Sequence, residues 1–138
     1  MNFAILHALG AFWRTKDLAR RLRARADVAH WRERQLDRFV KQVVTKVPFY
    51  AGLHASRLED LPIVDKQMVL ANFDKLNTHG VTYSAARAAL DAKQERVDGL
   101  IVGQSTGTSG NRGVFVISEA ERFTWLGVIL AKTLPDFP

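Results

Sequence analysis

The 138-residue sequence predicts an α/β fold in which long helices come first and a β-hairpin comes late. Residues 11–47 carry apolar side chains at the spacing of an amphipathic helix. Two short apolar stretches, 100–104 and 113–118, enclose a glycine-rich run, as expected for paired strands around a loop. The chain is 47% hydrophobic, an ordinary content for a globular protein of one domain.

The N-terminal part is expected to form one or two long helices. One apolar face repeats at helical spacing and consists of Leu36, Phe39, Val40, Val43, Val44 and Val47. Pro48 cannot continue such a helix, because it lacks the backbone N–H and its ring clashes with the preceding turn. We therefore divide the chain into a basic helical region, residues 1–47, and a second region, residues 48–138.

Three further helices are predicted from their first residues. Asp65 is expected to cap a helix over residues 66–73, and Thr82 or Ser84 to cap one that runs to residue 93. The tetrad 118–121, Ser-Glu-Ala-Glu, is a capping box that opens a last helix. The apolar face of this last helix would be formed by Phe123, Leu126, Ile129 and Leu130.

The run between the two predicted strands, residues 103–113, contains four glycines, four Ser or Thr residues and one arginine. Glycine lets the backbone approach a ligand closely, and successive N–H groups and hydroxyls can converge on an anion. The run matches neither the Walker loop nor the G-x-G-x-x-G pattern, and an exposed hairpin loop is the alternative interpretation. The candidate phosphate-binding residues are Ser105, Thr106, Gly107, Thr108, Ser109, Gly110 and Arg112.

The segment 105–110, Ser-Thr-Gly-Thr-Ser-Gly, resembles the phosphate loop of the adenylate-forming superfamily. The likeness is to the branch of phenylacetate–CoA ligases, CapK-like proteins and CoF synthetases. Three more stretches in the same order support it: 46–50 (Lys-Val-Pro-Phe-Tyr), 61–74 (Leu-Pro-Ile-Val-Asp-Lys through Asn-Phe-Asp) and 76–82 (Leu-Asn-Thr-His-Gly-Val-Thr). The resemblance covers about residues 31–125.

This resemblance implies that the loop wraps the β- and γ-phosphates of ATP, with Mg²⁺, while a carboxylate substrate attacks the α-phosphorus. The products would be an acyl-adenylate and pyrophosphate, with possible transfer to CoA or another acceptor. Many members carry Pro-Lys after the last glycine, whereas this chain reads Asn111-Arg112. Arg112 is expected to supply the cation, since its guanidinium binds phosphate oxygens in a two-point fashion.

The chain is much shorter than a complete adenylate-forming enzyme, whose adenine, acyl and late catalytic-lysine elements follow the loop. We therefore expect it to be the N-terminal part of such a ligase, an incomplete domain with the first hairpin of the mixed sheet. The chain alone is expected to bind nucleotide or pyrophosphate weakly at most and to be catalytically inactive.

The positive charge is concentrated near the N-terminus. Residues 14–46 hold eleven of the twenty Lys and Arg residues against four acidic ones. A non-enzymatic module that docks this basic helix on nucleic acid or an acidic membrane surface is therefore the alternative function. Because no nucleic-acid motif accompanies the basic helix, we expect no specific nucleic-acid partner.

Other kinds of site find little support. The sequence has no cysteine, and no two of its four histidines are four residues apart, so neither a thiolate nor a zinc site is expected. The apolar first thirteen residues are shorter than a membrane span, lack the pattern of a secretory signal and are expected to pack against the protein. A cytoplasmic location is predicted.

Overall fold

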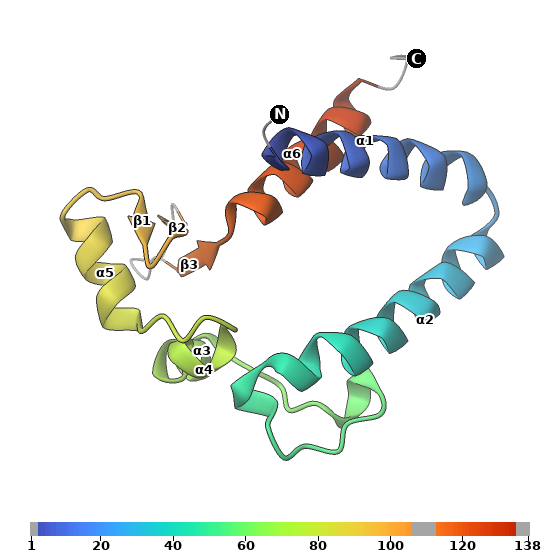
Figure 1. Cartoon of the computed structure of the whole chain (residues 1–138). Helices are drawn as coiled ribbons and strands as arrows, with labels where there is room; N and C mark the ends of the chain where they lie inside the picture. The colour runs from blue at the N-terminus through green and yellow to red at the C-terminus, as the bar shows by residue number, and fades with distance from the viewer. Residues whose placement is uncertain (1–2, 106–112, 135–138) are drawn as a thin grey trace. The chain divides into compact units, whose positions relative to one another are not determined.

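The computed structural model describes residues 3–105 and 113–134, which combine helices with one small sheet (Figure 1). The α/β character expected from the sequence is therefore confirmed. In chain order the helices and strands are α1 (Phe3–Arg21), α2 (Arg25–Gln42), α3 (Lys66–Ala71), α4 (Phe73–Leu76), α5 (Tyr83–Asp91), β1 (Arg96–Val97), β2 (Leu100–Gln104), β3 (Val114–Ile117) and α6 (Glu119–Thr133). Single 3₁₀ turns lie at Val44–Lys46, Pro48–Tyr50 and Leu58–Asp60.

The chain forms two compact units. The first joins the described parts of residues 1–29 and 117–138, and the second consists of residues 30–116. The first unit is thus built from two segments far apart in sequence. The boundary at residue 47 that the sequence suggested stays a prediction.

The first unit is a pair of helices, α1 and α6, held by small residues. Ala4, Ala11, Gly127 and Ala131 are buried in this unit, together with one large side chain, that of Phe12. A Cβ atom at Gly127 would collide with the backbone carbonyl of Ala8 and lie 3.0 Å from the Cβ of Ala11. Near the other end of the pair, Lys16 Nζ donates a hydrogen bond of 2.6 Å to the carbonyl oxygen of Leu134. These contacts mean that the two helices run in the same general direction, as Figure 1 also shows.

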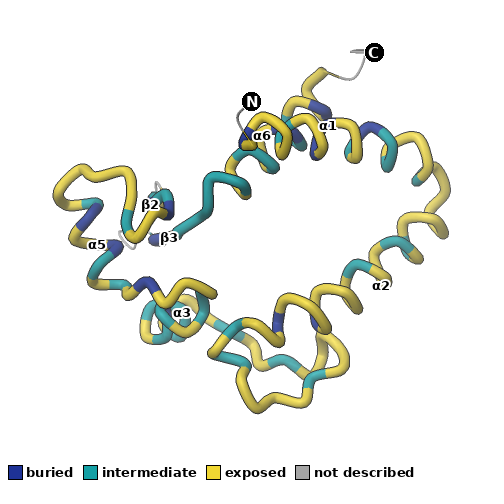
Figure 2. Tube along the Cα trace, in the orientation of Figure 1, coloured by how far each residue is buried: buried dark blue, intermediate teal, exposed yellow. Residues whose placement is uncertain are grey.

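The predicted apolar face of the last helix is only partly covered. Phe123 and Ile129 are half-buried and Leu126 and Leu130 are exposed, whereas the fully buried positions are Gly127 and Ala131. Figure 2 shows how buried, half-buried and exposed positions alternate along α6. The physical reason is distance: glycine and alanine let the helix backbones approach closely, which a leucine at the contact would prevent.

The second unit has a core in which α4, α5 and the segments between them pack on the sheet. Its buried residues are Phe73, Val81, Ala86, Ala89, Leu100, Val102 and Val114. Tyr83 packs against this core, and its ring meets that of Phe73 edge to face at 5.9 Å between centroids. The core therefore supports both long strands of the hairpin from one side.

The amide of Asn77 connects α4 to the core. Its Nδ2 donates to the carbonyls of Phe73 at 2.5 Å and Val81 at 2.9 Å. Its Oδ1 accepts from the N–H groups of His79 at 3.2 Å and Val81 at 3.0 Å. All the donors and acceptors of the side chain are thus used within one turn, which directs Val81 into the core.

The predicted helix starts are confirmed at three positions. The side-chain oxygen of Asp65 accepts from Met68 N–H at 2.7 Å, and that of Thr82 accepts from Ala85 N–H at 3.1 Å. The capping box before α6 is complete, with Ser118 Oγ accepting from Glu121 N–H at 3.2 Å and Glu121 Oε2 accepting from Ser118 N–H at 2.7 Å.

The long N-terminal helix is divided. It starts at Phe3, breaks over residues 22–24, and ends at Gln42, several residues before Pro48. Of the apolar face predicted for its second half, Val40 and Val44 are buried, whereas Leu36, Phe39 and Val43 are exposed. The apolar face predicted for residues 36–47 is thus only partly buried within the second unit.

The sheet has the order β1-β2-β3. β1 was not predicted; it pairs antiparallel with β2 in the register Arg96↔Ile101 and Val97↔Leu100. Asp98 and Gly99 form the two-residue turn between them with φ values of 48° and 78°. This is the left-handed backbone that an Asp-Gly hairpin turn requires.

Candidate phosphate-binding loop

The candidate loop begins and ends at a pair of hydrogen bonds. Ser105 N–H donates to the carbonyl oxygen of Gly113 at 2.8 Å. In return, Gly113 N–H donates to Ser105 Oγ, also at 2.8 Å. The two ends of the candidate loop, Ser105 and Gly113, are therefore held together and form a closed root.

This root stands on the core of the second unit. Leu100 and Val102 on β2 and Val114 on β3 are buried, so alternate residues of the hairpin hold it to the helices. On the other face, the exposed ring of Phe115 covers Gly103, where a Cβ atom would lie 2.7 Å from the Cε2 atom of the ring. A larger residue at position 103 would force this ring to move aside.

Of the predicted phosphate-binding residues, Ser105 lies within the described part of the chain. Thr106, Gly107, Thr108, Ser109, Gly110 and Arg112 lie outside it. Ser105 Oγ accepts from Gly113 N–H. Ser105 thus has a structural role in the hairpin, and its predicted role in phosphate binding stays a prediction.

The partners of Ser105 and Gly103 across the hairpin were not predicted from the sequence. The register of the hairpin contains this information: when residue 105 pairs with residue 113, residue 103 lies opposite residue 115. Gly103 and Phe115 then form a glycine–aromatic pair, a known device for covering a glycine within a strand.

A surface pocket of about 330 Å³ lies elsewhere in the second unit, between α2 and the 3₁₀ turn at Leu58–Asp60. Three carboxylates, from Glu33, Asp37 and Glu59, line it with one guanidinium, that of Arg57. Since like charges repel, this excess of carboxylates makes the pocket unsuitable for a phosphate. It contains none of the predicted site residues.

Asp60, beside this pocket, closes its own turn. Its Oδ2 accepts from Ser56 N–H at 2.8 Å, Arg57 N–H at 2.9 Å and Ser56 Oγ at 3.0 Å. The Ser56 backbone bond, followed by the other two, lowers the pKa of this carboxyl from its ordinary value of 3.8. The carboxylate therefore holds the turn at residues 56–60 together, and these hydrogen bonds occupy the oxygen that could otherwise bind a ligand.

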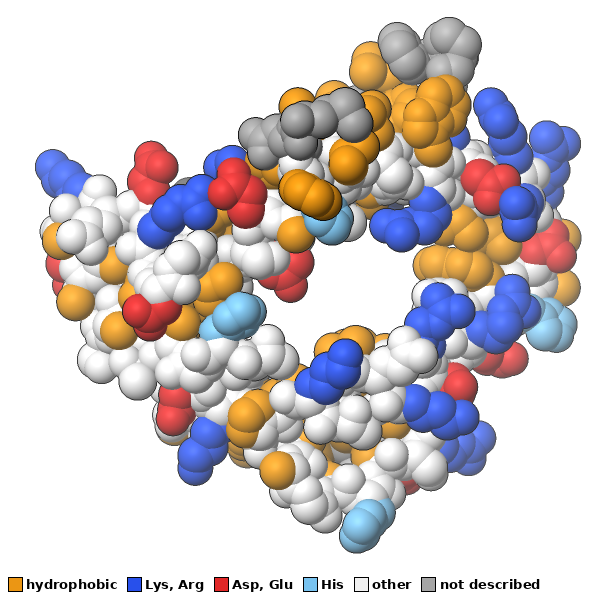
Figure 3. Space-filling view, viewed as in Figure 1, with side chains coloured by type: hydrophobic (Ala, Val, Ile, Leu, Met, Phe, Trp, Pro, Cys, Tyr) orange, Lys and Arg blue, Asp and Glu red, His pale blue; other side chains and the backbone are white. Residues whose placement is uncertain are grey.

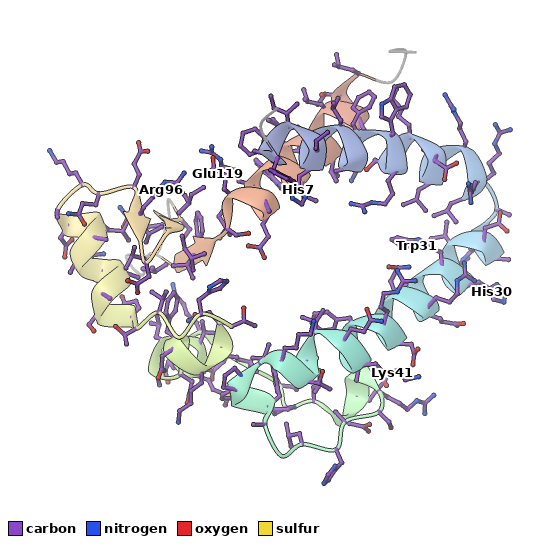
Figure 4. The ribbon with its side chains drawn as sticks, in the orientation of Figure 1. His7, His30, Trp31, Lys41, Arg96 and Glu119 are labelled. Atoms are coloured by element: carbon purple, nitrogen blue, oxygen red, sulfur yellow. The ribbon has the colours of Figure 1, made fainter. Side chains whose placement is uncertain are left out.

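The histidines do not build a site. Among residues 3–105 and 113–134, no group of three His, Cys, Asp or Glu side chains is placed to hold a metal ion. His30, Trp31 and Lys41 project from α2 as separate side chains (Figure 4). Nor does any helix in the described part combine the length and apolar character that crossing a bilayer requires.

The Ser105→Ala change tests the closed root. We expect it to lower the free energy of unfolding by about 1 kcal/mol, since Gly113 N–H loses its acceptor. Ser105→Thr keeps the hydroxyl and should stay within about 0.5 kcal/mol of the parent. Urea denaturation measures both, and equal stability of all three proteins would contradict the structural role of Ser105.

No protein-family model, curated protein sequence or solved structure matches this chain.

Proposed function

We propose that this chain is the N-terminal part of an ATP-dependent adenylate-forming ligase, which converts a carboxylate and ATP to an acyl-adenylate and pyrophosphate. The observation that carries the proposal is the loop 105–113, rich in glycine and hydroxyls, on a root closed by two hydrogen bonds. Such a root holds the two ends of the loop together, which lowers the chain entropy that the loop has to lose when an anion binds.

In this proposal the loop holds the β- and γ-phosphates of ATP. Hydroxyls at positions 105, 106, 108 and 109 donate hydrogen bonds, and the glycines allow close approach of the backbone. Arg112, next to the closing residue Gly113, supplies positive charge. Donors arranged in advance would stabilise the negative charge that grows on pyrophosphate as it leaves.

The donor set of the loop suits phosphate rather than a metal ion. Hydroxyls, N–H groups and a guanidinium bind anions, and the described residues offer no carboxylate or imidazole group of three for a cation. Mg²⁺ would therefore reach this part of the enzyme bound to ATP and would neutralise phosphate charge. Because ATP is the substrate, we place the ligase in the cytoplasm.

Calorimetric titration with pyrophosphate and with MgATP tests the proposal. We expect weak binding of both, no ATP–pyrophosphate exchange by this chain, and complete loss of binding in the double variant Gly107→Val, Gly110→Val. Arg112→Ala should weaken binding about tenfold, as expected for a charge-assisted hydrogen bond.

Arg87→Ala is the matched control, since Arg87 is an exposed arginine of α5 that pairs with Asp91 at 2.9 Å. It should leave pyrophosphate binding unchanged. If the glycine and Arg112 variants bind pyrophosphate as the parent does, the loop is only a hairpin turn and the proposal fails.

A further inference from the structure

The helix pair of the first unit leaves large apolar side chains uncovered. Trp13 is 50% exposed and Trp125 is 66% exposed. Leu6 and Leu9 are also exposed, and with Trp13 they lie on the side of α1 opposite Ala8 and Ala11, the residues that face α6; we call this side the outer α1 surface. Figure 3 shows hydrophobic side chains gathered over these two helices. The contact between α1 and α6 is made largely by small residues, so it leaves these large apolar side chains exposed to solvent.

Basic side chains continue the same surface along α1. Arg20 follows Trp13 by seven residues, which is about two helical turns. It therefore lies on the same side of α1 as Leu6, Leu9 and Trp13. Residues 14–25 carry six Lys or Arg residues and one acid, Asp17. Asp17 pairs with Arg21 at 2.9 Å, while Arg14, Arg20 and Arg25 are exposed.

The apolar and basic side chains lie next to each other, which limits the kinds of partner that could bind both. Nucleic acid would bind the arginines through its phosphates but would leave the exposed tryptophans and leucines in water. A second copy of the chain would cover the apolar side chains but would add a second basic segment of the same sign. An anionic bilayer satisfies both, because apolar side chains enter the acyl boundary while arginines stay among acidic headgroups.

We propose that the outer α1 surface docks on an anionic membrane surface, with Leu6, Leu9 and Trp13 inserted at the interface and the arginines of residues 14–25 against acidic headgroups. Tryptophan favours this depth, because its ring is apolar and its N–H needs a polar partner. The inference uses none of the residues of the phosphate loop, but it requires that the rest of the proposed ligase leave this side of α1 uncovered, and separate measurements therefore test the two proposals.

Vesicle co-sedimentation of the full chain provides the test. We expect binding to phosphatidylcholine vesicles that contain phosphatidylserine, weaker binding to phosphatidylcholine alone, and release by salt. The double variant Leu9→Ser, Trp13→Ser should reduce binding at least tenfold. Arg20→Ala and Arg25→Ala should each reduce binding to the anionic vesicles about fivefold.

Matched changes on α2 form the control. Phe39→Ser with Arg38→Ala removes an equally exposed aromatic residue and a basic residue from the second unit. This pair should leave vesicle binding unchanged. Circular dichroism checks that each variant keeps its helices.

A second readout avoids any loss of folding. In a chain with Trp31→Phe and Trp125→Phe, Trp13 is the single tryptophan, and its emission should shift to shorter wavelength on the anionic vesicles. Absent binding, or equal binding to neutral vesicles, overturns the proposal. So does retention on duplex DNA without vesicle binding, or a dimer in sedimentation equilibrium that the Leu9→Ser, Trp13→Ser variant abolishes.

Discussion

Replacing Gly127 by alanine should destabilise the first unit, although alanine is the better helix former. The added Cβ would meet the backbone carbonyl of Ala8, which belongs to a helix and cannot turn aside as a side chain can. Crowding of this kind costs about 1–3 kcal/mol, and helix propensity offsets about 1 kcal/mol. Gly127→Leu cannot be accommodated without separating α1 from α6. We expect it to lower the free energy of unfolding by more than about 3 kcal/mol in urea denaturation.

Gly10 supplies a matched control. It lies within α1, and a Cβ atom there would have no heavy atom within 4 Å. Gly10→Ala should therefore raise the free energy of unfolding by about 0.5–1 kcal/mol through helix propensity alone. Similar behaviour of the alanine variants at positions 10 and 127 would mean that α1 and α6 do not pack closely in solution.

Loss of the Asn77 amide should have the other large effect. Asn77→Ala leaves the carbonyls of Phe73 and Val81 and the N–H groups of His79 and Val81 without their side-chain partner. Each partly buried polar group that loses its hydrogen-bond partner lowers the free energy of unfolding by about 1–3 kcal/mol, although water can replace some of these bonds. We expect a loss of about 2–4 kcal/mol in the free energy of unfolding.

The N77D variant adds a pH dependence to this test. Its carboxylate can still accept from the two N–H groups, but it faces the two carbonyl oxygens without a donor. The pKa of the new carboxyl should therefore rise above its unfolded value. A pKa that is higher in the folded than in the unfolded protein means that the folded state disfavours the charged carboxylate. The free energy of unfolding should therefore increase as the pH falls through the folded pKa. Asn72→Ala, which removes a single 3.1 Å bond to Met68, is the control and should cost much less.

Local signals in the sequence predicted the helix starts well. Asp65, Thr82 and Ser118 cap their helices because a short side-chain oxygen satisfies an N–H two or three residues ahead, which is a local matter. The turn at Asp98-Gly99 was equally readable, since this dipeptide favours the left-handed backbone of a tight hairpin. Its short strand β1 was not predicted, because two residues are too few to show the alternation of apolar and polar side chains that marks a strand.

The packing of α6 could not be read in the same way. Hydrophobicity indicated Leu126 and Leu130, whereas the contact is made by Gly127 and Ala131. Which side of an all-round apolar helix is covered depends on the partner helix, and α1 lies about a hundred residues earlier in the chain. The loop itself was predicted from composition, while the hydrogen bonds between Ser105 and Gly113 needed the register of the hairpin.

The bond between Lys16 and Leu134 joins residues 118 positions apart. During synthesis at about 5–20 residues per second, α1 waits roughly 6–24 s before α6 exists. The whole second unit is made in that interval and can fold first. Throughout it, the side of α1 that packs on Gly127 stays without α6. Among the described helices, α1 is thus the earliest to be made and among the last to be packed.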